Sequence, residues 1–227
     1  MSGMRVAVSW SGGKDSSLSL HRAAGSGLHC CHLLNMVDVD YSRSMSHGLD
    51  KELIAAQADA MQIPIVQKAT SWGTYEREFK AALECLKLEG IQGMVFGDID
   101  LAEHREWVER VCGEAGLAPI LPLWGDAPET LLNEFIEAGF EAVVVAAKAD
   151  LFDDEWLGKP VDLELVSSLI TLSRQSGFHP CGEKGEYHTL VTDGPVFRKR
   201  INILQYRKVV RDGYRFLDIS GYRVEDR

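Results

Sequence analysis

A glycine-rich segment near the N-terminus constrains the fold of this 227-residue chain more than any other feature. It follows the apolar run Arg5–Trp10, opens a helical pattern, and reads Ser9-Trp10-Ser11-Gly12-Gly13-Lys14-Asp15-Ser16. Two adjacent glycines let the backbone turn tightly and approach a ligand closely. The free N–H groups at the start of the following helix, together with the helix dipole, attract an anion. We therefore expect a strand–loop–helix unit that binds phosphate.

The polar side chains of this loop support the same expectation. Ser11 and Ser16 add hydroxyl donors, and Lys14 adds a positive charge. An acid is misplaced in an anion site, so we expect Asp15 to orient Lys14 or to hold a magnesium ion. The loop is not a Walker A loop, because Val8 stands where that motif has glycine and an aspartate follows the lysine. The alternative is a ligand-free strand–helix turn with capping serines.

Apolar runs alternate with helical patterns over residues 1–125. Five runs are strand candidates: Arg5–Trp10, His29–Val37, Ile63–Gln67, Gly93–Gly97 and Ala118–Leu121. Amphipathic stretches with a helical period lie between them. This alternation predicts an α/β fold with a parallel sheet and helices on both faces, in which ligands bind at the carboxyl ends of the strands.

The pattern changes after residue 125. We expect a helix over Pro128–Ala138, a buried run over Ala142–Ala147 and a second helix over Val161–Ser176, followed by an end richer in strand signals. Asp193-Gly194 and Asp212-Gly213 are turn signals within this last part. A domain boundary without a flexible linker is therefore expected near residue 125.

Composition and charge argue against several classes of protein. No apolar run reaches the roughly 20 residues that span a bilayer, and the N-terminus turns polar too soon for a signal peptide, so we expect a cytoplasmic protein that does not enter a membrane. The net charge of −10 disfavours non-specific binding to nucleic acid. Between Pro195 and Arg215, seven basic residues stand against one acid, a net +6. This basic segment either faces a phosphate-bearing partner or is the solvated face of a β-hairpin.

The run Ser11-Gly12-Gly13-Lys14-Asp15-Ser16 resembles the S-G-G-x-D-S signature of PP-loop ATP pyrophosphatases. The resemblance implies that the loop grips the pyrophosphate portion of ATP and that AMP is transferred to an oxygen of the substrate. It also implies a five-stranded parallel sheet of the adenine-nucleotide α-hydrolase-like (HUP) type with a smaller α+β domain at the C-terminal end. Residues 1–125 then form the ATP-binding domain and residues 126–227 the acceptor-substrate domain.

Four further segments are similar to the diphthine–ammonia ligase family of these enzymes: Glu89–Ile99, Pro122–Gly125, Trp156–Gly158 and Gly182–Val191. The similarity implies an ATP-dependent ligase that adenylates a diphthine-like carboxylate, releases pyrophosphate and amidates the acyl group with ammonia. The implied partners are ammonium and a protein acceptor such as a translation elongation factor. A homodimer also fits a chain of this size.

Two parts of the chain supply candidates for the chemistry. Asp98 lies just past a predicted strand end, where a carboxylate can hold magnesium or position ammonium; the alternative is a helix N-cap. Glu183, Glu186 and His188 lie within six residues of a glycine-broken segment. They can hold ammonium, deprotonate it or orient the acceptor, and the alternatives are a divalent metal site or a solvent-facing loop. His47, which follows the second strand, could meet the nucleotide.

These candidates form three sets. The predicted nucleotide-binding residues are Ser9, Ser11, Gly12, Gly13, Lys14, Asp15, Ser16, His47 and Gly97. The predicted catalytic residues are Lys14, Asp15, Asp98, Glu183, Glu186 and His188. The predicted magnesium ligands are Asp15 and Asp98.

Two other functions stay open at this point. A tRNA-modifying PP-loop enzyme would adenylate a base carbonyl and often uses a cysteine pair. Cys112 and Cys181 are the candidates for that pair among five cysteines that form no C-x-x-C motif. A non-catalytic, regulatory ATP-binding protein would keep the phosphate loop, although the clustered acids argue against it.

Overall fold

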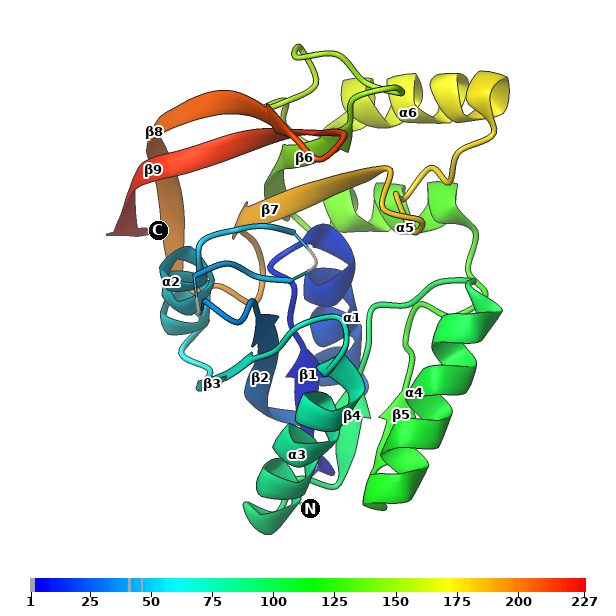
Figure 1. Ribbon diagram of the computed structural model, residues 1–227, viewed down its shortest axis with the longest axis vertical. Helices are drawn as coiled ribbons and strands as arrows, with labels where there is room; N and C mark the ends of the chain where they lie inside the picture. Colours follow the sequence, from blue (N-terminus) through cyan, green and yellow to red (C-terminus); the bar gives the residue numbers. More distant parts are fainter. Residues whose placement is uncertain (1–2, 41, 46) are drawn as a thin grey trace.

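A computed structural model describes residues 3–40, 42–45 and 47–227 of the chain (Figure 1). Its first half is a five-stranded parallel sheet in the order β3-β2-β1-β4-β5, which confirms the predicted sheet. The strands are β1 (Arg5–Ser9), β2 (His29–Val37), β3 (Ile65–Ala69), β4 (Gly93–Val95) and β5 (Ala118–Ile120). The strand order reverses between β1 and β4, and such a switch point is where α/β sheets bind ligands.

Helices cover both faces of this sheet. One face carries α1 (Lys14–Gly25) and α2 (Lys51–Met61), and the other carries α3 (Tyr75–Leu88) and α4 (Ala102–Ala115). The alternation of side chains along β1 separates two cores: Val6 and Val8 pack with α1 and α2, whereas Ala7 packs with α3 and α4. Both faces of β1 and β4, at the centre of the sheet, are therefore buried, which explains their nearly continuous apolar runs.

The second half contains an antiparallel sheet in the order β7-β6-β9-β8. Its elements are α5 (Pro128–Glu137), β6 (Glu141–Lys148), α6 (Leu163–Ser176), β7 (Tyr187–Asp193), β8 (Lys199–Arg211) and β9 (Tyr214–Asp226). Asp212 and Gly213 join β8 to β9 with φ values of 51° and 78°. Two positive φ angles are what a tight hairpin turn requires, so the expected turn is confirmed.

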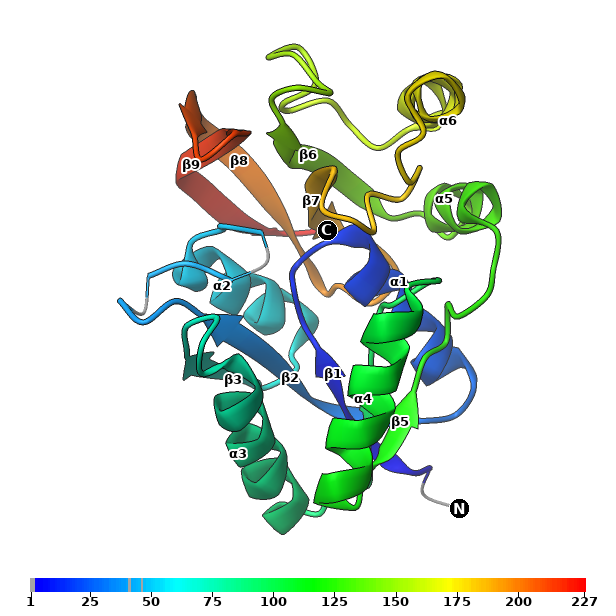
Figure 2. The same cartoon turned by 45° about the vertical axis from the view of Figure 1, so that its right-hand side comes forward.

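The two sheets share one apolar core. Helix α1 lies between the first sheet and β7 (Figure 2), and its buried leucines belong to the same cluster as Val144, Leu190 and Phe135 of the second half. Arg22, in the last turn of α1, adds a polar link. Its guanidinium donates to the Pro122 carbonyl (2.7 Å) and to carboxylates of Asp126 (2.5 Å) and Glu134 (2.8 Å).

The basic segment expected near the C-terminal end lies mainly on the β8–β9 hairpin. Arg207 pairs with Asp218 at 2.8 Å, and Arg215 pairs with Asp154 at 2.7 Å. Pairing within the chain favours the hairpin interpretation over a free basic surface. No helix of the described residues is long and apolar enough to cross a bilayer.

We predict that Arg22→Met lowers the free energy of unfolding by about 1–2 kcal/mol, because it leaves acceptors of α5 and the preceding loop without their shared donor. Urea titration followed by circular dichroism measures this loss. Arg77→Met is the control, since Arg77 is 75% exposed and pairs with its neighbour Glu78; its cost should stay below about 0.5 kcal/mol. Equal losses in the two variants would contradict a linking role for Arg22.

Candidate active site

The phosphate loop joins β1 to α1 beside the switch point of the sheet. Gly12 has a φ of 84°, and a Cβ there would lie 2.5 Å from the Ile54 side chain. A Cβ at Gly13 would lie 2.5 Å from Nε2 of His47. Close neighbours therefore leave little room for a side chain at either position. Gly12 also has a left-handed backbone, which favours glycine.

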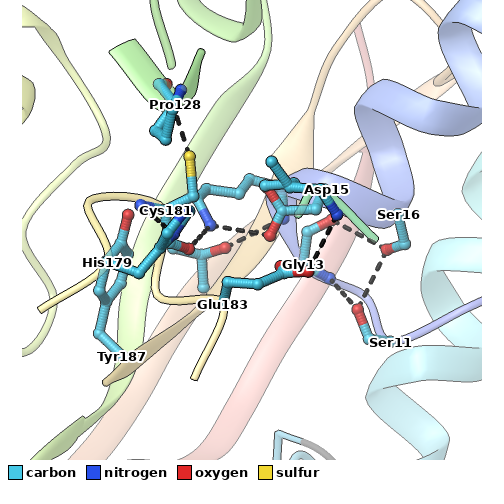
Figure 3. A network of polar contacts seen from close by, with 12 residues as sticks. Ser11, Gly13, Asp15, Ser16, Pro128, His179, Cys181, Glu183 and Tyr187 are labelled. Carbon is cyan, nitrogen blue, oxygen red and sulfur yellow. Dashed lines mark hydrogen bonds and ion pairs between the residues drawn. The ribbon is translucent and has the colours of Figure 1, made fainter. Parts of the chain in front are cut away.

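Hydroxyl groups shape the loop from inside (Figure 3). Ser11 Oγ accepts from the Gly13 amide at 3.3 Å and lies 3.1 Å from Ser16 Oγ, which donates to the Gly13 carbonyl at 3.0 Å. Gly13 is also the N-cap of α1 and supplies no capping side chain. The helix start therefore presents the positive end of its dipole at the loop.

Gln57 of α2 supports the phosphate loop and was not predicted from the sequence. Its side chain is fully buried; Nε2 donates to the carbonyls of Gly12 (3.0 Å) and Val191 (2.7 Å), and Oε1 accepts from the Trp10 indole at 3.2 Å. The Val191 amide donates to the same Gly12 carbonyl at 3.0 Å. The sequence feature that could have identified Gln57 is its position as a polar residue within the apolar helical stripe of Leu53, Ile54, Ala58 and Met61.

Lys14 connects the loop to the second half of the chain. Its ammonium donates to Asp15 Oδ2 at 2.8 Å and to the Cys181 carbonyl, and it lies 4.9 Å from the centre of the Tyr187 ring. Burial is the largest single effect and lowers the pKa of Lys14, but the interactions with Asp15, Tyr187 and Cys181 together outweigh it, so the pKa of Lys14 is raised. Lys14 therefore keeps its charge at neutral pH, and Asp15 orients it.

Two histidines from the two halves meet beside Gly13. The rings of His47 and His188 lie 4.4 Å apart. Burial, assisted by the charges of Lys14 and Lys148, lowers the pKa of His188 to about 4. Burial also lowers the pKa of His47 well below its ordinary value. Both imidazoles are neutral at pH 7, so each can offer hydrogen bonds without a charge.

Three side chains, here called the acidic group, face the loop: Asp98 after β4, His104 in α4 and Glu183 before β7. Asp98 Oδ1 lies 3.0 Å from Nδ1 of His104, and Glu183 Oε1 accepts from the Ile99 amide at 2.9 Å. Ligand atoms of Asp98, His104 and Glu183 all lie within 4.8 Å of one another. Burial, followed by the charges of Asp15 and Asp98, raises the pKa of Glu183 to about 7. His104 is a second residue that the sequence reasoning missed.

Glu186 lies outside the cavity wall and is only 3% exposed. Its two oxygens accept from the amides of His179 (3.0 Å) and Lys184 (2.9 Å). These bonds hold the turn that carries Cys181 and Glu183. The catalytic role expected for Glu186 stays a prediction.

A cavity of about 470 Å³ lies at the carboxyl edge of the sheet, between the phosphate loop and the acidic group. Its wall includes the predicted residues Ser9, Ser11, Lys14, Asp15, Ser16, His47, Gly97, Asp98, Glu183 and His188. Aromatic side chains form another part of the wall: Trp72, Tyr75, Phe79, Phe96 and Trp107. A cavity with an anion-binding helix start, carboxylates and apolar surface suits a nucleotide and a second, reacting molecule.

Neither Cys112 nor Cys181, the candidate cysteine pair, is in a site that favours a thiolate. Burial raises the pKa of Cys112 to about 12, and it raises the pKa of Cys181 as well. A nucleophilic cysteine needs a lowered pKa. The thiol-dependent tRNA-modifying function is therefore not favoured by this site.

A Ser-Gly-Gly-Lys-Asp-Ser loop at the switch point of a 3-2-1-4-5 parallel sheet defines the class of the protein as a PP-loop ATP pyrophosphatase. The chain belongs, more narrowly, to the diphthamide synthase family. The model of the diphthamide synthase N-terminal domain matches residues 4–119, and that of the C-terminal domain matches residues 127–224. The protein is accordingly an ATP-dependent ligase.

Curated relatives named diphthine–ammonia ligase are similar to this protein over nearly its full length. It is 32% identical to the diphthine–ammonia ligase of Rattus norvegicus, a match that covers 99% of this chain and 94% of the rat protein. It is 30% identical to that of Homo sapiens, over 97% and 90% of the two chains. A solved chain from Methanocaldococcus jannaschii, described as a predicted subunit of tRNA methyltransferase, is 17% identical with a TM-score of 0.46, covering 85% of this chain and 98% of that one. A likeness at that level carries no argument about function.

We predict that Gln57→Glu weakens ATP binding at least about tenfold, because the carboxylate repels the two carbonyls to which the amide donates. Calorimetric titration with ATP and magnesium measures the change, and circular dichroism checks the fold. Gln175→Glu, on the exposed side of α6, is the matched control and should bind ATP like the wild type. Unchanged affinity in a folded Gln57→Glu protein would show that Gln57 does not shape the loop.

A second prediction concerns the pH dependence of stability. Folding raises the pKa of Glu183 from 4.5 to about 7, so its contribution is fully present below about pH 4.5 and is lost as the pH rises through about 7. Relative to Glu183→Gln, the wild type should lose on the order of 2–3 kcal/mol of unfolding free energy over that range. Urea titrations at several pH values measure it. Glu137→Gln, an exposed glutamate in α5, is the control, and parallel curves for the wild type and Glu183→Gln would refute the raised pKa.

Proposed function

We propose that the protein adenylates the carboxylate of a protein-bound diphthine, releases pyrophosphate and converts the acyl-adenylate to an amide with ammonia. The observation that carries this proposal is the single cavity that contains both the phosphate loop and the Asp98–Glu183 group. A carboxylate is inert to ammonia until its oxygen becomes a good leaving group, and AMP is such a group. The curated relatives named diphthine–ammonia ligase support the choice of acceptor.

We assign the two outer phosphates of ATP to the start of α1. The dipole of that helix and the fixed charge of Lys14 stabilise the departing pyrophosphate. The neutral rings of His47 and His188, next to Gly13, offer hydrogen bonds to phosphate oxygens. The α-phosphate then points away from the loop, toward the acidic group.

Magnesium fits this cavity on grounds of charge. Asp15, Asp98 and Glu183 all line it, whereas Lys14 is the single lysine or arginine among the described residues of its wall. Asp98 and Asp15 would hold the ion. Bound magnesium would neutralise the negative charge that develops on the phosphates. Glu183 is not needed as a magnesium ligand in this arrangement and can act as a base.

We assign Glu183 as the base that takes a proton from ammonium. Its carboxyl group lines the cavity beside Asp98, where it can accept that proton. The resulting ammonia attacks the acyl carbon, the C–N bond forms as the C–O bond to AMP breaks, and the excess proton on nitrogen leaves to solvent. A protein acceptor, such as an elongation factor, a cytoplasmic location and a homodimer stay predictions from the sequence.

The products provide the first experiment. With a diphthine-bearing protein, ATP, magnesium and ammonium, we expect AMP and pyrophosphate in equal amounts with the amide, measured by anion-exchange chromatography and mass spectrometry. Formation of ADP and phosphate instead would exclude adenylation.

Glu183→Gln separates the two half-reactions. We predict that amide formation slows by about 10²–10⁴-fold, while exchange of labelled pyrophosphate into ATP persists. Hydroxylamine is largely unprotonated at neutral pH and needs no base, so hydroxamate formation should be close to that of the wild type. Glu137→Gln should behave like the wild type in both assays. A hydroxamate rate reduced as much as the amide rate would show that Glu183 acts in adenylation.

A further inference from the structure

The loop that carries His47 is tied to a distant part of the chain, the β8–β9 hairpin. It joins β2 to α2, is here called the histidine loop, and is described over residues 38–40, 42–45 and 47–50. Arg43, within this loop, donates to the Gly48 carbonyl at 2.8 Å and to Asp218 Oδ1 of β9 at 2.7 Å. One guanidinium therefore connects the residue next to His47 to the hairpin.

The Asp218 carboxylate has one guanidinium on each oxygen. Its second oxygen accepts from Arg207, the residue opposite it on β8, at 2.8 Å, and its side chain is only 13% exposed. The hydrogen bond from Arg43 is the largest effect on the pKa of Asp218 and, with that from Arg207, lowers it although burial acts the other way. The carboxylate is therefore charged at neutral pH, and charge-assisted hydrogen bonds of this kind are among the strongest in proteins.

The same face of β9 packs against the histidine loop. Phe216 and Asp218 are two residues apart on the strand and so lie on one face, whereas Leu217 between them is buried in the core. Gly48 has a φ of 63°, and a Cβ there would lie 3.2 Å from the Phe216 ring. The residue that follows His47 therefore lies directly against the hairpin.

Strand β9 supports the second histidine of the cavity as well. The ring of Tyr214 lies 6.5 Å from that of His188 and 5.9 Å from that of Phe216. The Tyr214 hydroxyl donates to the Gly185 carbonyl at 2.9 Å, in the segment that precedes β7. The two imidazoles that meet beside Gly13 thus come from segments that contact the same strand.

We propose that Asp218 and Arg43 are positioning residues for nucleotide binding, because they hold His47 at the phosphate loop. The proposal rests on the proposed function, which assigns the His47 ring to phosphate oxygens. A Cβ at Gly13 would lie 2.5 Å from His47 Nε2, so the ring lies against the start of α1. A hydrogen bond weakens steeply when its geometry departs from the optimum, so a histidine loop without its tie to the hairpin binds phosphate less well.

Asp218→Asn removes the charge and keeps the size of the side chain. It should raise the dissociation constants of a non-hydrolysable ATP analogue and of pyrophosphate, each with magnesium, by about three- to tenfold, and leave that of adenosine unchanged. Phosphorus and proton NMR titrations measure the three constants, and circular dichroism checks the fold. An equal loss of affinity for adenosine, or unchanged constants for all three ligands, would overturn the proposal.

Asp154→Asn is the matched control for this variant. Asp154 forms a 2.7 Å ion pair with Arg215 of the same hairpin and lies outside the cavity wall. The substitution therefore removes a carboxylate charge from an ion pair of the hairpin without releasing the histidine loop. We expect Asp154→Asn to bind all three ligands like the wild type, and a loss equal to that of Asp218→Asn would contradict a specific role for Asp218.

A double-mutant cycle tests whether Asp218 acts through His47. In the His47→Ala background, Asp218→Asn should change the dissociation constant of the ATP analogue by less than about twofold, because the contact that it positions is gone. A loss of the same size in both backgrounds would assign Asp218 a purely structural role and overturn the proposal. Arg43→Met gives a second route to the same cycle if Asp218→Asn does not fold.

The ring signals of His47 separate this proposal from the ligase proposal. They are identified in the NMR spectrum of the nucleotide-free protein by their loss in His47→Ala, and they should shift in Asp218→Asn but not in Asp154→Asn. If the wild type fails to bind the ATP analogue, the ligase proposal fails, whereas such a shift would still show that Asp218 positions His47. Unchanged His47 signals would reject the positioning role and leave the ligase proposal intact.

Discussion

The carbonyl group of Gly12 determines the shape of the phosphate loop. It accepts from the side chain of Gln57 and from the main chain of Val191, so α2 and β7 hold the same atom from two directions. This fixes a backbone with positive φ at the point where a ligand must approach. A loop held before ligand binding loses little conformational entropy when phosphate arrives, which is the basis of preorganised recognition.

The electrostatics of the cavity follow from burial acting differently on different groups. Burial favours neutral histidines, and the pKa values of His47 and His188 fall accordingly. Lys14 is buried as well, yet its interactions with Asp15, Tyr187 and Cys181 together raise its pKa and keep it charged. One fixed cation, two uncharged rings and a carboxyl group that titrates near neutrality therefore coexist within one cavity. Such separated titrations are how a single cavity can bind an anion and also transfer a proton.

Local features of the chain were predictable, and features that depend on the packing of distant segments were not. The loop and the five strands follow from adjacent residues, although β3 begins at Ile65 rather than Ile63, because Pro64 in between has no N–H to donate. Glu186 and Glu183 look alike in the sequence, but one turns back to its own loop amides and the other faces Asp98. His104 joins Asp98 and Glu183 only because α4 places it beside Asp98.

One of the contacts between Lys14 and the second half of the chain uses the carbonyl of Cys181 rather than its side chain. Any amino acid has that oxygen, so the position can change identity over evolutionary time without loss of the contact. An alignment of related chains would then show variation at a point of direct contact, and its importance would be visible only in three dimensions. A contact made through the main chain can therefore be kept while the amino acid at that position changes.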